Sequence, residues 1–101
     1  MLVATVKQGR IEIKKSNGGT FKTLAPSGGA VSAYINADET LIVYTTTKGN
    51  VEVCKTAGGG TRSICRDCTD ARWCGNDIQV TTTKGHVELW RVTGGKIRTI
   101  S

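Results

Sequence analysis

The sequence predicts an all-β protein built from three copies of one unit. The copies align without an internal gap on a shared glycine, at intervals of 40 and 36 residues: Gly9, Gly49 and Gly85. Valine, isoleucine and threonine are frequent, and the chain has thirteen glycines and one proline, which is typical of short strands joined by tight turns. No segment has a helical hydrophobic period longer than one turn. Repeats at such intervals indicate units that bury their faces by stacking on their neighbours.

Each copy is predicted to form a meander of three strands. In the second copy, the alternating segment Leu41–Thr47 leads into a tight turn at Gly49, and the strand Val51–Lys55 follows. A second turn, rich in glycine, precedes a third strand in every copy: Thr20–Leu24, Thr61–Ile64 and Lys96–Ile100. The repeat is thus a strand–turn–strand–turn–strand unit.

Two further segments are predicted to add a leading strand to the second and third copies. Ala30–Asn36 is followed by the turn Ala37–Thr40, and Asp70–Cys74 by the turn Gly75–Asp77. The first copy has no such segment before it in this sequence. We expect one domain whose units span about residues 2–26, 30–65 and 70–101.

The four-stranded unit resembles the blade of a WD-type β-propeller in the order and spacing of its strands and turns. Trp90 lies five residues after Gly85, where a WD repeat carries its tryptophan. The sequence departs from the pattern in two ways. The WD aspartate is replaced by a basic residue in each copy, and the Gly-His dipeptide of the WD pattern is missing from its place in the repeat. The resemblance implies blade-like sheets, and no particular functional subfamily.

The number of units leads to an expectation about assembly. Propellers generally close with about four to eight blades, whereas this chain encodes three, the first incomplete. We expect two chains to form a homodimer that completes a six-bladed ring, the first unit of each chain packing on the third unit of the other. The two end faces should then be about as apolar as an interior. The alternative is a β-trefoil-like monomer with threefold internal symmetry.

A glutamate is repeated three residues after the shared glycine of each copy: Glu12, Glu52 and Glu88. Glutamate is depleted in strands, and a partly buried carboxylate needs a cationic partner. The second hairpin could bring a base of the third strand beside it, and such a base is repeated too: Lys22, Arg62 and Arg98. We expect a ladder of ion pairs between strands or sheets. The alternative is a functional ring of carboxylates around a central channel.

The formal net charge is +6, and the basic residues are spread through all three copies. The first turn of each copy carries a lysine, and the third also carries the only histidine: Lys7, Lys48, Lys84 and His86. We expect these turns to project from one rim, where they would attract a polyanion or an acidic partner. The alternative is that they are simply polar turns.

Four cysteines, Cys54, Cys65, Cys68 and Cys74, are spaced C-x10-C-x2-C-x5-C. Cys65 and Cys68 have the spacing of a metal knuckle, to which Cys74 or His86 could add a ligand, but a second C-x2-C pair is missing. Free thiols are therefore favoured, with a disulfide within the Cys65–Cys74 loop as one alternative and a metal site as the other. Cys54 aligns with Trp90 and is predicted to be a core thiol.

The sequence contains no nucleophile–base pair at a motif spacing, no Walker loop and no dinucleotide fingerprint. We therefore expect no enzyme and no cofactor, but a binding scaffold that contacts another protein. Two alternatives are nucleic-acid binding through the basic turns and carbohydrate binding at unit junctions, where Trp73 could stack on a sugar. No apolar run approaches the roughly 20 residues of a membrane span, and no signal peptide is evident, so we expect an intracellular, cytoplasmic protein without membrane contact.

Overall fold

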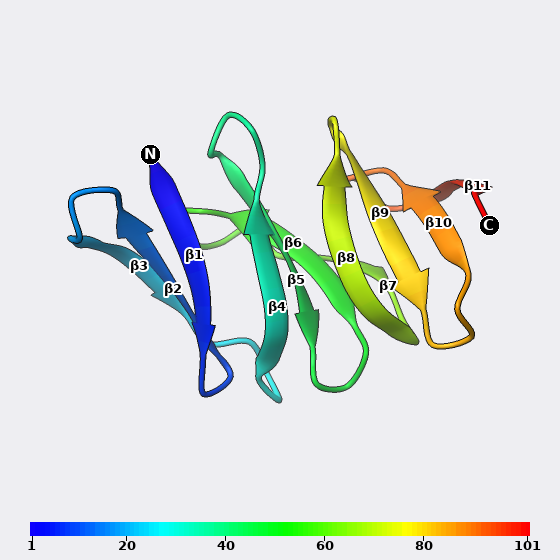
Figure 1. The fold of residues 1–101 in the computed structure, drawn as a ribbon, viewed down its shortest axis with the longest axis horizontal. Helices are drawn as coiled ribbons and strands as arrows, with labels where there is room; N and C mark the ends of the chain where they lie inside the picture. Colours follow the sequence, from blue (N-terminus) through cyan, green and yellow to red (C-terminus); the bar gives the residue numbers. More distant parts are fainter.

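The computed structural model describes residues 1–101 and contains eleven β-strands and no helix. The strands form three antiparallel sheets (Figure 1). The first sheet contains β1 (Leu2–Lys7), β2 (Arg10–Lys15) and β3 (Thr20–Leu24). The second contains β4 (Ala30–Ile35), β5 (Leu41–Thr46), β6 (Val51–Lys55) and β7 (Arg62–Cys65). The third contains β8 (Cys68–Cys74), β9 (Asp77–Thr82), β10 (Val87–Trp90) and β11 (Lys96–Thr99). The predicted all-β class is confirmed.

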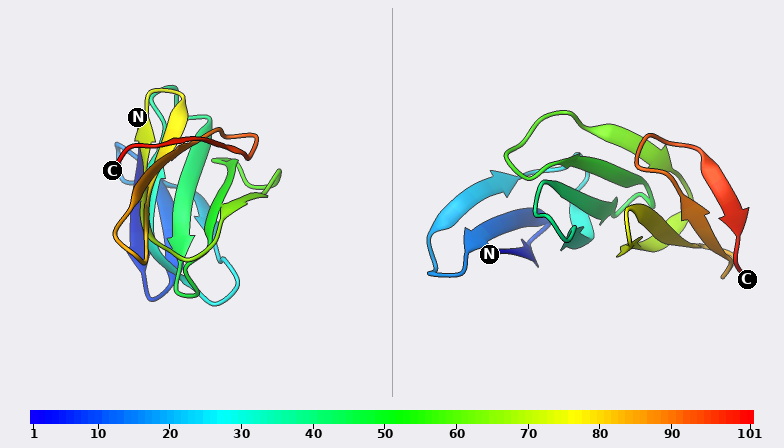
Figure 2. Two further views of the ribbon diagram at one scale, coloured as in Figure 1. Left: turned by 90° about the vertical axis from the view of Figure 1, so that its right-hand side faces the viewer. Right: turned by 90° about the horizontal axis from the view of Figure 1, so that it is seen from above.

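Every sheet is a meander in which each strand pairs with the next strand of the chain. The sheets lie side by side in an open arc, with β1, β4 and β8 on its concave side and β3, β7 and β11 on its convex side (Figure 2). The chain termini lie at the two ends of the arc, whose longest dimension is 39 Å. The trefoil-like alternative is wrong, because the first and third sheets lie at opposite ends and enclose no common core.

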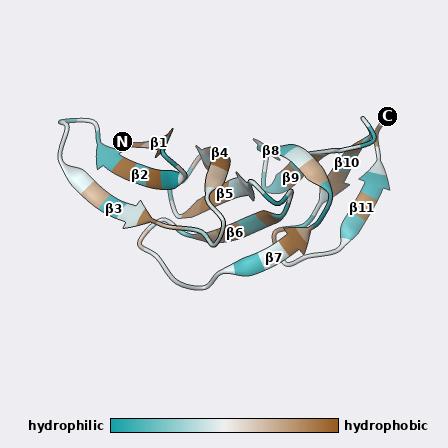
Figure 3. Cartoon of the chain, turned by 90° about the horizontal axis from the view of Figure 1, so that it is seen from below, coloured by the Kyte–Doolittle hydropathy of each residue, from teal (hydrophilic) through white to brown (hydrophobic).

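The core consists of two layers, one at each junction between neighbouring sheets. The junction of the first and second sheets buries Ile11, Ile13, Ala30, Ile42, Tyr44 and Cys54. The junction of the second and third sheets buries Val43, Val51, Val53, Ile64, Cys68, Ala71, Ile78 and Val80. Because strand side chains alternate, β5 supplies both layers, and all but its first residue are buried. Figure 3 shows the hydrophobic segments on the strands, with hydrophilic segments frequent on β3, β7 and β11.

Backbone hydrogen bonds also connect the sheets near the first hairpin turns. The Ala30 N–H donates to the Gly9 carbonyl at 2.8 Å, and the Cys68 N–H donates to the Gly49 carbonyl at 2.9 Å. Each bond attaches the leading strand of one sheet to the turn of the sheet before it. The two junctions therefore share one backbone geometry as well as one kind of core.

The first hairpin differs from its two counterparts by one residue. Lys7 pairs directly with Arg10, so the turn consists of Gln8 and Gly9 alone, both with positive φ (52° and 80°). In the second sheet the Thr46 N–H instead bonds the Asn50 carbonyl, which leaves three residues in the turn, and the third sheet repeats this pattern. The gapless alignment is therefore wrong for β1. By register, Val3, Ile42 and Ile78 are equivalent, because each lies opposite the same position of the strand that follows it. Val3 pairs with Lys14 of β2, Ile42 with Cys54 of β6 and Ile78 with Trp90 of β10.

The arc ends in two sheet faces without a neighbour. We call the outward face of the first sheet the N-terminal face; it carries Val3, Thr5, Lys7, Arg10, Glu12 and Lys14. The outward face of the third sheet, the C-terminal face, carries Gln79, Thr81, Val87, Leu89, Arg98 and Ile100. The expectation that both faces are as apolar as an interior is wrong, because charged and polar side chains alternate with the apolar ones on each.

Candidate functional site

The first hairpin turns of all three sheets lie along one edge of the arc, at the bottom of Figure 1. We call this the basic edge. It carries the exposed side chains singled out in the sequence: Lys7, Lys48, Lys84 and His86. The structure thus brings these residues to one side of the molecule, in a row along the arc rather than in a single cluster.

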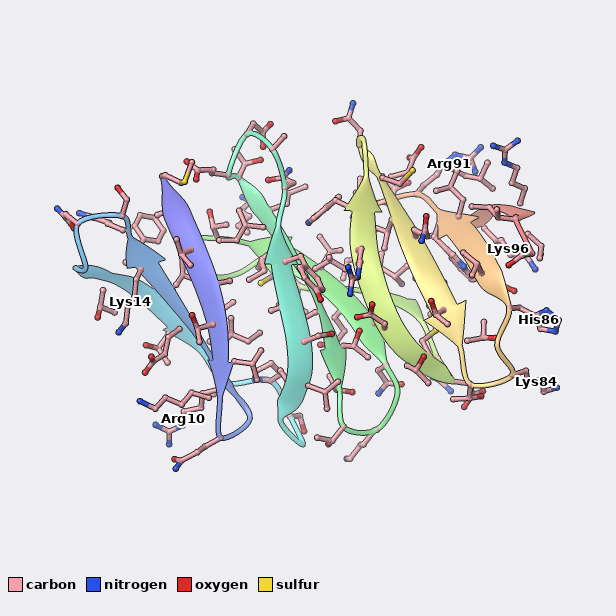
Figure 4. The ribbon with its side chains drawn as sticks, viewed as in Figure 1. Arg10, Lys14, Lys84, His86, Arg91 and Lys96 are labelled. Carbon is pink, nitrogen blue, oxygen red and sulfur yellow. The ribbon has the colours of Figure 1, made fainter.

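Further basic residues gather at the two ends of the arc (Figure 4). Arg10 and Lys14 belong to the first sheet, Lys96 belongs to the third, and Arg91 directly follows β10 of the third. All four are exposed. The sequence analysis did not single out these four as site residues. The basic residues of each copy were a signal, but the grouping depends on which sheets lie at the two ends of the arc.

The repeated glutamates do not pair with the repeated third-strand bases Lys22, Arg62 and Arg98, so that prediction is wrong, although Glu88 does pair with another third-strand base. Glu12 lies 3.9 Å from Lys14, Glu88 lies 3.6 Å from Lys96, and Glu52 has no ion-pair partner. The reason is the alternation of side chains. In each sheet the glutamate of the middle strand points toward the N-terminal end of the arc. The repeated third-strand base pairs with the next residue of the middle strand and therefore points toward the C-terminal end.

The third-strand bases instead reach the second hairpin of the next sheet. Arg62 donates a hydrogen bond at 3.3 Å to the carbonyl of Thr93. The Lys22 side chain lies against Gly58, 2.9 Å from where a Cβ at that position would be. Gly58 and the residue after Thr93 are equivalent glycines in the two hairpins. At both junctions, therefore, a repeated third-strand base reaches the second hairpin of the next sheet, and Arg62 also hydrogen-bonds there.

A hollow of about 270 Å³ lies beside Glu52 at the first junction, lined also by Leu24, Pro26, Tyr44 and Thr61. The Tyr44 hydroxyl donates to the Glu52 carboxylate at 2.6 Å. Burial raises the pKa of Tyr44, and the adjacent Glu52 carboxylate raises it further. The hydroxyl therefore stays protonated and holds the carboxylate in place. The thiol of Cys54 also lines the hollow, but burial raises the pKa of Cys54 and the Glu52 carboxylate raises it further, which disfavours its thiolate.

A second hollow, of about 490 Å³, opens at the basic edge between the second and third sheets. Hydroxyl-bearing side chains dominate its wall, together with a lysine and a glycine: Thr45, Thr46, Thr47, Thr69, Thr83, Lys48 and Gly49. The buried Thr45 hydroxyl has no hydrogen-bond partner. Hydroxyls beside a lysine can hold an anionic group, so this hollow is a candidate anion site on the basic edge.

The four cysteines are free. Cys54 is buried in the first junction, as its alignment with Trp90 predicts, and Cys74 is exposed. The Sγ atoms of Cys65 and Cys68 lie 2.9 Å apart. No group of three or more histidine, cysteine, aspartate or glutamate side chains is placed to hold a metal ion, so Cys74 and His86 do not join the pair.

Trp73, the candidate sugar-stacking residue, belongs to the second junction. Its indole N–H donates to the Tyr34 carbonyl at 2.9 Å, and its ring packs against the core. Nearby, the Arg72 guanidinium lies 5.1 Å from the centre of the Tyr34 ring and pairs with Asp70 at 3.0 Å. These contacts use Trp73 to join two sheets, which leaves it only partly exposed.

No known protein-family model matches the chain, and no curated protein matches it. The structure also contains no helix that could cross a membrane. Inferences about function therefore depend on the geometry of the arc, its end faces and its basic edge.

Proposed function

We propose that the chain is a non-catalytic binding scaffold that functions as a homodimer, two arcs closing into a six-bladed, propeller-like ring. The observation that carries this proposal is the exposure of two apolar residues at the ends of the arc. Val3 is 50% exposed, yet its equivalents Ile42 and Ile78 are fully buried. Ile100 is 50% exposed, whereas its sequence equivalent Ile64 is 7% exposed. Both ends thus carry half of a junction.

The internal junctions indicate how the ends would meet. The C-terminal face, with Val87, Leu89 and Ile100, would pack on Val3 of the other copy, as the second sheet packs on Ile78 of the third. Arg98 is the third-strand base equivalent to Lys22 and Arg62, and it lies on the C-terminal face. By analogy with Arg62, it would donate to a carbonyl in the second hairpin of the other copy, residues 15–19.

Charge makes this closing junction weaker than the internal ones. The N-terminal face carries three basic residues and one acid, and the C-terminal face carries Arg98 together with Arg72 and Asp70 of β8, whose charges cancel each other. The two faces therefore repel each other at low ionic strength, and salt screens this repulsion. We expect a reversible dimer that tightens as salt is raised.

Sedimentation equilibrium at about 50 and 500 mM salt tests the proposal, since these conditions change the Debye length several-fold. We expect a dimer of stoichiometry two, favoured at the higher salt. Ile100→Arg should shift the protein to monomer, and its melting temperature should match that of the wild type measured under monomeric conditions. Val31→Arg is the matched control, because Val31 is 52% exposed but lies on β4, away from both end faces. A wild-type chain that remains monomeric at both salt concentrations overturns the proposal.

The ring would place six lysine-bearing turns on one edge, where repeated weak contacts with an acidic partner protein add up through multivalency. A specific observation favours nucleic acid as the second candidate ligand, bound by a single arc: the exposed Arg10, Lys14, Arg91 and Lys96 extend its positive surface beyond the turns, and ring closure would cover Arg10 and Lys14. Nucleic-acid binding weakens steeply as salt rises, because bound counterions are released. Its salt response is therefore opposite to that of ring closure, and anisotropy of a labelled oligonucleotide over the same salt range separates the two.

A further inference from the structure

The connection between the second and third sheets holds two cysteines together. Cys65 ends β7 and Cys68 begins β8, with only Arg66 and Asp67 between them. Asp67 has φ +58°, a left-handed conformation that turns the chain back on itself. The two Sγ atoms lie 2.9 Å apart as a result.

Backbone hydrogen bonds fix this turn on both sides. The Cys68 N–H donates to the Gly49 carbonyl at 2.9 Å, and the Asp67 carbonyl accepts from the Thr83 N–H at 2.8 Å. One bond anchors the turn to the second sheet and the other to the third. The thiols are therefore neighbours because of the sheet packing as well as their spacing in the sequence.

We propose that Cys65 and Cys68 form a dithiol site that reacts with a low-molecular-weight disulfide, of the oxidised glutathione class, and closes to an intramolecular disulfide. The first thiolate attacks one sulfur of the small disulfide, forms a mixed disulfide and releases one small thiol. The second thiolate attacks the protein sulfur of that mixed disulfide and releases the second small thiol. The two protein thiols lose two protons and two electrons, and the small disulfide gains them.

The thiols are suited to this reaction in complementary ways. Cys65 is partly exposed, which gives a small disulfide access, whereas Cys68 is 3% exposed and lies directly behind it. The hydrogen bond between the thiols lowers the pKa of Cys68 and raises that of Cys65, so Cys68 carries the thiolate of the pair. Cys68 is therefore suited to the second step, the attack on a mixed disulfide formed at the accessible Cys65. The other cysteines lack such a neighbour: Cys54 lies in the other junction, and Cys74 is at the far end of β8.

Closure would affect only one of the two junctions. The disulfide would link the second sheet to the third, whereas the connection from β3 to β4 contains no cysteine. The link constrains the unfolded chain and stabilises the folded arc. This inference concerns a site within a single chain and does not depend on ring formation.

Mass spectrometry after equilibration in glutathione buffers tests the site. The purified full chain is incubated in oxidising and reducing glutathione mixtures, quenched with acid and alkylated with N-ethylmaleimide under denaturing conditions. In the oxidising buffer we expect loss of two alkylation sites out of four, and a Cys65–Cys68 link in the peptide map. Cys68→Ser should abolish the link and leave a mixed disulfide with glutathione at the accessible Cys65, and Cys65→Ser should abolish the link and leave the buried Cys68 as a thiol. Cys74→Ser, the matched control, should retain the link.

Two results would overturn the proposal: alkylation of both Cys65 and Cys68 in the oxidising buffer, or a link that joins either residue to Cys74. A stability measurement gives a second readout. The oxidised wild type should melt several degrees above the reduced form, on the order expected for a small domain. In Cys65→Ser and Cys68→Ser this difference should vanish, and persistence of the full difference counts against the site.

Discussion

The internal junctions and the end faces of the arc use the same strand positions with different side chains. Ile42 and Tyr44 face the first junction, and both are buried. Their register equivalents on the N-terminal face are Val3 and Thr5, which are exposed. At the position of the buried Cys54, the N-terminal face carries Lys14. One backbone pattern therefore supports a permanent interface in the middle of the chain and a weaker, wetter surface at its ends.

This difference indicates that the strength of each junction is set by a few alternating positions. A fully buried isoleucine contributes about 1.5–3 kcal/mol relative to an exposed one. A side chain that keeps half of its surface in water gains correspondingly less. The ends can thus expose part of a junction without unfolding the sheets behind it.

The largest effect should come from truncating equivalent residues on the two kinds of face. We expect Ile42→Ala to lower the free energy of unfolding by about 2–5 kcal/mol, because it leaves a cavity in a closed core. Val3→Ala, at the equivalent position of the N-terminal face, should cost less than about 1 kcal/mol under monomeric conditions. Urea denaturation of the two variants measures both values. Equal losses would mean that the end face is as closely packed as the junction.

A pH series tests the junction through Tyr44, whose equivalent on the end face is Thr5. Its pKa is raised in the folded protein, so the folded state keeps the proton that the unfolded state loses above about pH 10. The contribution is present below that pH and is lost above it, at no more than about 1.4 kcal/mol per pH unit. Tyr44→Phe should flatten the fall in stability between about pH 9 and 11, whereas the control Tyr34→Phe should not. An unchanged slope in Tyr44→Phe would contradict the assignment.

A smaller effect is expected from two glycines with nearly the same conformation. Gly49, in the second junction, has φ +82°, and Gly85, in the last turn, has φ +86°. Alanine at either site incurs a left-handed strain of about 1–2 kcal/mol. A Cβ at Gly49 would also lie 3.3 Å from the Cys68 carbonyl oxygen, whereas at Gly85 nothing lies within 4 Å. The melting temperature of Gly49→Ala should therefore be lower than that of Gly85→Ala in thermal scans under monomeric conditions. The reverse order would show that the backbone at Cys68 can shift to admit a Cβ at little cost in stability.

Much of the fold could be predicted from local patterns. Glycine-containing turns and alternating strands located the hairpins, and the missing leading strand of the first copy was visible as a missing segment. The shorter first turn, with Gln8 and Gly9 alone, could not be predicted, because a glycine turn can close with either two or three residues. The partners of the glutamates were also missed, since they depend on which neighbouring sheet each face meets.

The incomplete first sheet has a consequence for the inner surface of the proposed ring. β4 and β8 are the innermost strands of their sheets, whereas β1 is equivalent to β5 and β9, so the first sheet has no strand at that innermost layer. In a closed pair of arcs, the wall of the central opening would be formed by four such strands and interrupted twice, at opposite points. The passage would then be oval, with two lateral recesses over β1. A rod-like or two-fold symmetric guest would fit such a passage in one orientation better than in any other.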